Sequence, residues 1–173
     1  TAQVMARGSA TRDALAVDAA LGELGASFAI QVQQESARVG VDVLGRHLPE
    51  ALAVLADVVQ QPTFPAAEGD REKQLALARI AQVENDAAAL ASRTAAALAF
   101  GRDHPYSQPV IGYSGPVRAL TRDDLVRFHR EFWKPATTAL VLAGDITLSQ
   151  AVELAQTHFG AWTRGEAPPT VIP

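Results

Sequence analysis

The side chains in this sequence best suited to bind a metal or to transfer a proton are four histidines, because the chain contains no cysteine. They are far apart, and no pair has the spacing that would place two imidazoles on one face of a helix as zinc ligands. We therefore predict structural or surface roles for all of them. They are His47, His104, His129 and His158.

Other combinations of reactive side chains are equally dispersed. Acidic and basic residues alternate between Glu68 and Lys73, which is typical of a solvated helix surface whose ion pairs contribute about 0.3–0.5 kcal/mol each. Residues 112–116 (Gly-Tyr-Ser-Gly-Pro) superficially resemble a nucleophile elbow, but they lack its glycine spacing and follow no strand pattern, so a turn is expected. No nucleophile is placed beside a base, which disfavours an independent hydrolase of another kind.

Composition restricts the partners. The net charge is −4 and no Lys/Arg cluster is longer than a pair, so we expect neither nucleic acid nor anionic lipid as a partner. No apolar run approaches the roughly 20 residues that span a bilayer, so no membrane segment is predicted. The length suits one domain over residues 1–173. Residues 1–7 look like the end of a helix closed by Gly8, and the first residue is not Met, so we expect a segment of a longer protein.

Helical periodicity covers most of the chain. A helix that Thr11 could cap is expected up to Gly25, and another from Pro49 to the break at Pro62. A long helical region should run from about residue 66 to 99, interrupted near residues 85–86. The pairs Thr121–Asp124 and Thr147–Gln150 resemble capping boxes that start two further helices.

Alternating apolar residues predict strands around residues 28–32 and 39–43, and a short third strand at 138–143. The order of elements favours an α+β fold, a two-layer sandwich with a mostly antiparallel sheet and helices on one face. Gln31, Gln33 and Ser36 fall on the side away from the core. We predict that this edge contacts a peptide substrate by strand addition, and the plainer alternative is a solvated strand.

Seven short motifs in a fixed order resemble those of the M16 family of zinc peptidases, the insulinase or pitrilysin family. They cover nearly the whole chain, and His104 lies in one of them, while the opening strands of the family would precede Thr1. The motifs are Gly8-Ser9-Ala10-Thr11-Arg12, Leu24-Gly25, Pro62-Thr63-Phe64, Arg71-Glu72-Lys73, His104-Pro105-Tyr106, Leu120-Thr121 with Trp133 and Pro135, and Gly144-Asp145 with Phe159-Gly160-Ala161-Trp162.

The resemblance also implies where a zinc site should be. Active members carry His-x-x-Glu-His on the helix before the first motif, in which the histidines bind the metal and the glutamate deprotonates its water. A third carboxylate ligand follows on the long helix. The second His and the Glu would correspond to Gln3 and Ala2, and the third ligand would fall at Ala78 or Arg79. We therefore predict no zinc and no other cofactor in this chain, and no catalytic residue of its own.

Members of the family commonly pair an active half with a homologous half that has lost the motif. The resemblance thus implies a non-catalytic domain that forms part of a peptide-binding chamber and supports an active M16 half, in the same or a partner chain, which would hold the zinc. The family's commoner bacterial setting suggests the periplasm, with the cytoplasm as the alternative. A scaffold or assembly protein that keeps the fold without proteolysis is the alternative function.

Overall fold

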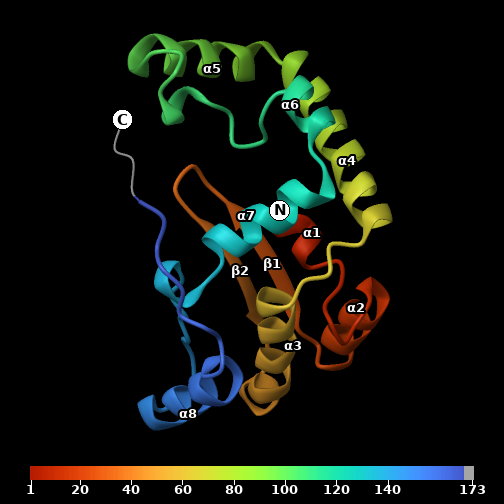
Figure 1. Cartoon of the computed structure of the whole chain (residues 1–173), viewed down its shortest axis with the longest axis vertical. Helices are drawn as coiled ribbons and strands as arrows, with labels where there is room; N and C mark the ends of the chain where they lie inside the picture. Colours follow the sequence, from red (N-terminus) through yellow and green to blue (C-terminus); the bar gives the residue numbers. More distant parts are fainter. Residues whose placement is uncertain (170–173) are drawn as a thin grey trace.

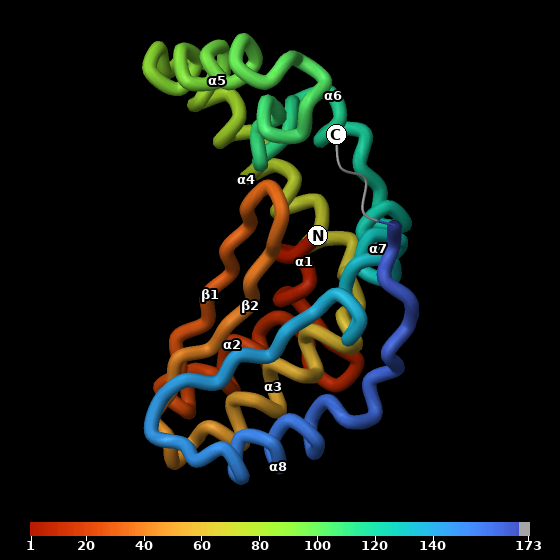
Figure 2. The backbone as a smooth tube through the Cα atoms, turned by 90° about the vertical axis from the view of Figure 1, so that its left-hand side faces the viewer, coloured from red at the N-terminus to blue at the C-terminus, as the bar shows by residue number. Residues whose placement is uncertain are grey.

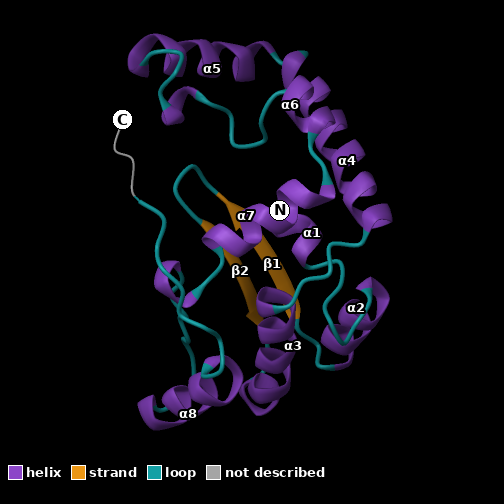
Figure 3. Ribbon diagram, in the orientation of Figure 1, coloured by secondary structure: helices purple, strands orange, loops and turns teal. Residues whose placement is uncertain are grey.

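The structure, a computed structural model, describes residues 1–169, in which helices surround one β-hairpin (Figure 1 and Figure 3). The elements in chain order are α1 (Ala2–Met5), α2 (Ala14–Glu23), β1 (Ser27–Val32), β2 (Ala37–Asp42), the 3₁₀ turn η1 (Gly45–His47), α3 (Leu48–Gln60), α4 (Ala66–Glu84), α5 (Ala87–Phe100), η2 (Pro105–Ser107), α6 (Ser114–Ala119), α7 (Arg122–Phe132), η3 (Pro135–Thr137) and α8 (Leu148–Phe159).

The hairpin is antiparallel, and its alternating residues separate an apolar face from a polar one. Phe28 lies opposite Val41, and Gln31 lies opposite Arg38 on the other face. Helices α1, α2 and α3 all contact the strands, and Figure 2 shows these helices together on one side of the hairpin. The predicted α+β fold with an antiparallel sheet and helices on one face is confirmed.

The core is formed by α1, α2 and α3 together with Phe64. Met5 and Val58 are fully buried, and Leu52 and Val17 are each 1% exposed. Burial of a large aliphatic side chain contributes about 1.5–3 kcal/mol, so this cluster determines where α1 lies. By contrast, α5 has no buried residue and α4 has only Ile80, so these two helices project from the body (Figure 1).

Three predicted helix starts are confirmed by their hydrogen bonds. Both predicted capping boxes form, at Thr121 and at Thr147. The break between α4 and α5 falls where the sequence predicts it, because the Asp86 side chain accepts hydrogen bonds from the backbone N–H groups of Ala88 and Ala89 and so starts a new helix.

Two predictions on the elements are wrong. Asp13, not Thr11, caps α2: its Oδ1 accepts from the N–H of Ala16 at 2.8 Å, while the Thr11 hydroxyl donates to Asp57 on α3. Residues 138–143 form no strand, since their backbone pairs with no neighbouring strand within residues 1–169. The apolar pattern there predicts an extended backbone, but a strand also needs a hydrogen-bonded partner, which the local sequence does not specify.

Candidate functional site

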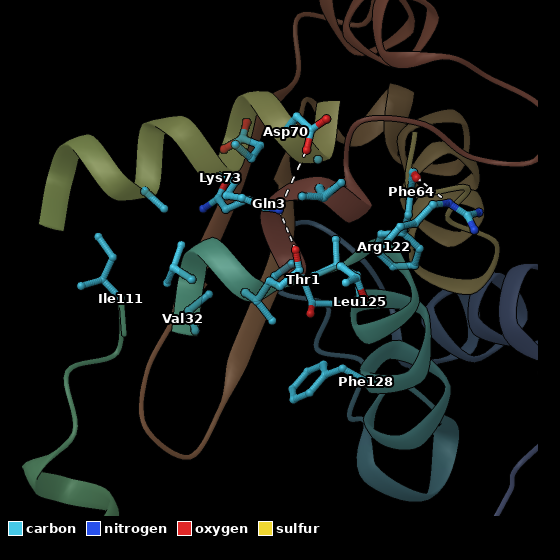
Figure 4. A pocket seen from close by; sticks show the side chains of 18 of the residues that line it. Thr1, Gln3, Val32, Phe64, Asp70, Lys73, Ile111, Arg122, Leu125 and Phe128 are labelled. Carbon is cyan, nitrogen blue, oxygen red and sulfur yellow. Dashed lines mark hydrogen bonds and ion pairs between the residues drawn. The ribbon is translucent and has the colours of Figure 1, made fainter. Parts of the chain in front are cut away.

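A cavity of about 640 Å³ lies between α1, α4, the segments around α6 and α7, and the end of the hairpin (Figure 4). Most of its lining is apolar, with a few charged side chains, which is the usual composition of a ligand site. The apolar lining comprises Ala2, Val4, Val32, Ala37, Phe64, Pro65, Ala66, Ala76, Val110, Ile111, Val117, Leu120, Leu125, Phe128 and Trp133.

Helix α4 forms one wall through residues spaced three or four apart. Gly69, Glu72, Lys73, Ala76 and Arg79 all line the cavity, because this spacing places side chains on one helix face. The small residues of this series leave room: a Cβ added at Gly69 would meet no atom within 4 Å.

Two of the charged groups on this wall already have partners. Lys73 Nζ donates to the carbonyl oxygen of Leu120 at 2.6 Å and lies 3.9 Å from Oδ1 of Asp70. The Glu72 side chain, 10% exposed, forms an ion pair with Arg7 at 3.1 Å. These contacts join α4 to α1 and to the segment before α7, and so hold the cavity walls together.

The lining just before the start of α4 contains a strained residue that is held by a cation. Phe64 has a φ of +48°, in the left-handed region that costs a side chain about 1–2 kcal/mol. Arg122 offsets this cost, because its Nε donates to the carbonyl oxygen of Phe64 and its Nη2 to that of Thr63, both at 2.9 Å. Phe64 is 2% exposed, so the strain places its ring in the interior beside the cavity.

His129 supports Phe64 from α7. The two rings meet edge to face with centroids 5.7 Å apart, and His129 Nε2 lies 2.8 Å from the carbonyl oxygen of Val59. Burial lowers the pKa of His129 below its ordinary value, although the bond to Val59 acts in the opposite direction. A neutral imidazole donating from Nε2 fits this position, so this histidine has a structural role, as predicted for all four.

The structure brings together three of the four positions that correspond to the zinc motif. Ala2 and Gln3 on α1 and Arg79 on α4 line the same cavity, whereas Ala78 is exposed and is not part of the lining. Because adjacent residues of a helix are rotated by about 100°, Arg79 is the one of the pair on the cavity-facing side of α4. Their assignment to the motif positions remains a prediction from the resemblance.

The donors at these positions do not suit a zinc ion. A methyl group stands at the position of the glutamate, an amide at that of one imidazole, and a guanidinium at that of the third carboxylate ligand. A guanidinium has no lone pair to offer a metal. Within residues 1–169, no group of three or more His, Asp or Glu side chains could hold a metal ion. Glu72 is bound to Arg7, and the side chain of Asp70 is 78% exposed.

The residues predicted to contact a peptide lie beside this cavity and not in it. Gln31 is exposed on the outer face of β1, and the N–H of Gln33 donates to the carbonyl oxygen of Ser36 at 2.8 Å, which closes the hairpin turn. Their neighbours Val32 and Ala37 line the cavity instead. The sequence signal for Val32 is its place in the alternating apolar set of its strand, although alternation alone indicates only that such a residue faces the core.

The hairpin turn also contacts the segment after α5. The Tyr106 hydroxyl donates a hydrogen bond to Oε1 of Glu35, and this bond, with the charge of Glu35, raises the pKa of Tyr106. His104 accepts from the N–H of Tyr106 through Nδ1 and stacks on Phe100 with a centroid distance of 5.3 Å. The His-Pro-Tyr motif therefore orders a loop that meets the hairpin.

Solved structures share this arrangement of elements, which defines the fold of the chain as an α+β fold also found in peptidase structures. It matches the peptidase M16 inactive domain of Pseudomonas fluorescens with a TM-score of 0.90 and 26% identity, over 98% of this chain and 41% of that one. It matches the periplasmic protease PqqL of Escherichia coli with a TM-score of 0.85 and 18% identity, over 99% of this chain and 20% of that one, a likeness of fold.

Sequence profiles extend this likeness to the family. The profile of the insulinase peptidases matches residues 2–112, and that of the peptidase M16 inactive domain matches residues 119–173. The chain therefore belongs to the insulinase (M16) peptidase family, and the predicted resemblance is confirmed.

Two relatives show the range of the family. A zinc protease of Mycobacterium tuberculosis, described as uncharacterized, is 37% identical over 162 residues, which cover 92% of this chain and 36% of the relative. Human cytochrome b-c1 complex subunit 1 is 30% identical over 172 residues, which cover 96% of this chain and 35% of the relative. The chain thus spans just over a third of the length of these relatives.

Proposed function

We propose that this chain is a non-catalytic domain of an M16-type zinc metallopeptidase that forms part of the peptide-binding chamber and supports an active partner half. The observation that carries this proposal is the cavity in which Ala2, Gln3 and Arg79 meet, at the positions assigned to the zinc motif. Ala2 has no donor atom, the Arg79 guanidinium has no lone pair, and the neutral Gln3 amide is neither a usual zinc ligand nor a base for a zinc-bound water. Zinc would belong to the active half.

Features of the surface agree with a second M16 domain as the partner. Leu98 and Phe100 at the end of α5 are 82% and 52% exposed, and apolar side chains gathered at a helix end favour contact with another domain. A neighbouring structure is described as the first half of PqqL, so such proteins can consist of two halves. The active half would lie in the same chain or in a partner chain.

The peptide would lie along the hairpin. Within the described residues, β1 and β2 pair only with each other, so each has a free edge that could accept an extended peptide through backbone hydrogen bonds. Gln31, Gln33 and Ser36 are the exposed polar side chains proposed to contact it. By analogy with PqqL, we propose the periplasm as its location. No helix within residues 1–169 has the length and apolar character required to cross a membrane.

A scaffold without proteolysis is the second candidate. It is favoured by the 30% identity to a human protein named as a subunit of the cytochrome b-c1 complex. Such a protein would keep the fold and its surfaces for assembly and would have no active M16 half beside it.

Purification of the native complex from the organism that encodes this chain separates these possibilities. We expect a partner half with a His-x-x-Glu-His motif, one zinc ion per complex, and peptide cleavage that a chelator abolishes, with neither zinc nor cleavage in the isolated chain. One tightly bound zinc and chelator-sensitive cleavage in the isolated chain would overturn the proposal. An assembly without such a partner and without cleavage would favour the scaffold.

A further inference from the structure

The charged groups of the cavity leave a positive charge without an acidic partner. Glu72 is paired with Arg7, and Asp70 lies near Lys73. Arg79 forms no ion pair and no side-chain hydrogen bond with any residue in the range 1–169. The cavity therefore presents one free guanidinium beside mainly apolar walls.

The geometry of α4 explains why the acids on this wall do not neutralise Arg79. Glu72 is seven residues before Arg79, which is about 10 Å along a helix at 1.5 Å per residue. Asp70 is farther still, and its side chain is mostly solvated. An ion pair needs its charged atoms within about 4 Å, so both carboxylates are too far along the helix.

Apolar side chains surround the side of the cavity toward which α4 runs. Figure 4 shows Val32 and Ile111 on the side of the cavity beyond Lys73, and both residues line the same cavity as Arg79. Gln3, at the other wall, is an exposed lining residue whose amide makes no hydrogen bond to another residue within 1–169. A ligand here would meet a cation, an amide and an apolar surface together.

We propose that this cavity binds the free C-terminal carboxylate of a peptide whose last side chain is apolar, with Arg79 binding the carboxylate. A guanidinium matches a carboxylate with two parallel hydrogen bonds, and Val32 and Ile111 would cover the side chain. This inference rests on the proposed function, because it specifies which part of a peptide the chamber wall recognises.

A chain end suits the cavity better than an internal acidic residue. The last residue of a peptide brings a carboxylate and an apolar side chain into the cavity while only one peptide group enters. An internal Glu or Asp would draw peptide groups on both sides along apolar walls, where each unpaired N–H or C=O is costly.

The test compares three fluorescein-labelled pentapeptides by anisotropy with the purified chain. The first ends in Leu-Leu with a free carboxylate, the second is its C-terminal amide, and the third is an amide that ends in Leu-Glu. We expect the free carboxylate to bind about 10- to 100-fold more tightly than either amide, the range expected for hydrogen bonds to a charged group. Binding should also weaken between 0.1 and 1 M salt.

Two variants assign the effect to one side chain. Arg79→Gln should bind the free carboxylate and its amide equally, and circular dichroism should show an unchanged fold because Arg79 is exposed. Arg71→Gln is the matched control, since Arg71 is on α4, its side chain is 66% exposed, and it does not line the cavity. It should keep the preference.

Three results would overturn the inference: equal binding of the carboxylate and the amide, binding of the Leu-Glu amide as tight as that of the free carboxylate, or a preference that survives in Arg79→Gln. Lack of saturable binding up to millimolar peptide would also do so. These outcomes are separate from the proposed function, which depends on the zinc content and cleavage of the native complex.

Discussion

Replacement of Asp57 by alanine should destabilise the fold, because this carboxylate accepts hydrogen bonds from three side chains. Oδ2 of this side chain accepts hydrogen bonds from Ser9 Oγ and Thr11 Oγ1, each at 2.5 Å, and from Arg12 Nη1 at 2.9 Å. Asp57 lies on α3, while its partners lie in the segment between α1 and α2. One carboxylate therefore fixes that segment against the core.

The expected loss follows from these contacts. A net hydrogen bond to a charged group contributes about 1.5–3 kcal/mol when it is buried. The Asp57 side chain is 12% exposed, but Thr11 is exposed and Arg12 is 33% exposed, so their contributions are discounted for solvent. The contributions of the three hydrogen bonds do not add, because the bonds share one acceptor. We therefore expect Asp57→Ala to lower the unfolding free energy by about 3 kcal/mol, which corresponds to a decrease of about 6–12 °C in Tm for a chain of this length.

Urea unfolding followed by tryptophan fluorescence measures this loss. Asp18→Ala is the matched control, because Asp18 is exposed on α2 and should change the unfolding free energy by no more than about 0.5 kcal/mol. Arg12→Ala should lower the unfolding free energy by about 1 kcal/mol or less. An Asp57→Ala loss no larger than that of the Asp18 control would refute the reasoning from this network.

Three further predictions concern stability. Gly8→Ala should lower the unfolding free energy measured in urea by about 1–3 kcal/mol, because the φ of Gly8 is +156° and an added Cβ would lie 2.9 Å from Thr63 Oγ1. Gly69→Ala should raise the unfolding free energy by about 0.5–1 kcal/mol, because a Cβ at this helical position would meet no atom within 4 Å. The unfolding free energy should fall as the pH drops below about 6.5, because folding lowers the pKa of His129 and the unfolded state therefore binds more protons. The His129→Gln variant should lose less unfolding free energy than the parent between pH 7 and pH 5, as measured by urea denaturation at both pH values. Thr121→Ala should lower the unfolding free energy measured in urea by about 1 kcal/mol, since it removes the N-cap of α7.

Each of these predictions has an outcome that contradicts it. Equal effects of alanine at the two glycines would show that the close approach of Gly8 to Thr63 does not matter. An unchanged slope between pH 5 and 7 in His129→Gln would assign the acid sensitivity to other groups. A Thr121→Ala variant as stable as the parent would show that Asp124 alone maintains the start of α7.

Local patterns in the sequence were sufficient for much of the fold. The two capping boxes and the break at Asp86 depend on hydrogen bonds within four residues, so the pattern and the structure agree. The hairpin follows from alternating apolar residues in two nearby segments. The ordered motifs also predicted the family, which the profiles confirm.

Other features depend on contacts between distant segments and could not be read from the pattern. Asp13 caps α2 because the Thr11 hydroxyl instead donates a hydrogen bond to Asp57 on α3, a residue far away in the chain. Residues 138–143 have an apolar pattern typical of a strand, but whether they form one depends on a partner strand that the pattern does not name.

The sequence by itself determined the chemistry available at Ala2, Gln3 and Arg79, because a methyl, an amide and a guanidinium keep their character in any fold. Only the tertiary structure decided that α1 and α4 bring them to one cavity, and that the acids on α4 lie too far along the helix to neutralise Arg79. The physical reason is that side-chain chemistry is local, whereas packing of the buried faces of α1 and α3 positions helices that are distant in the chain.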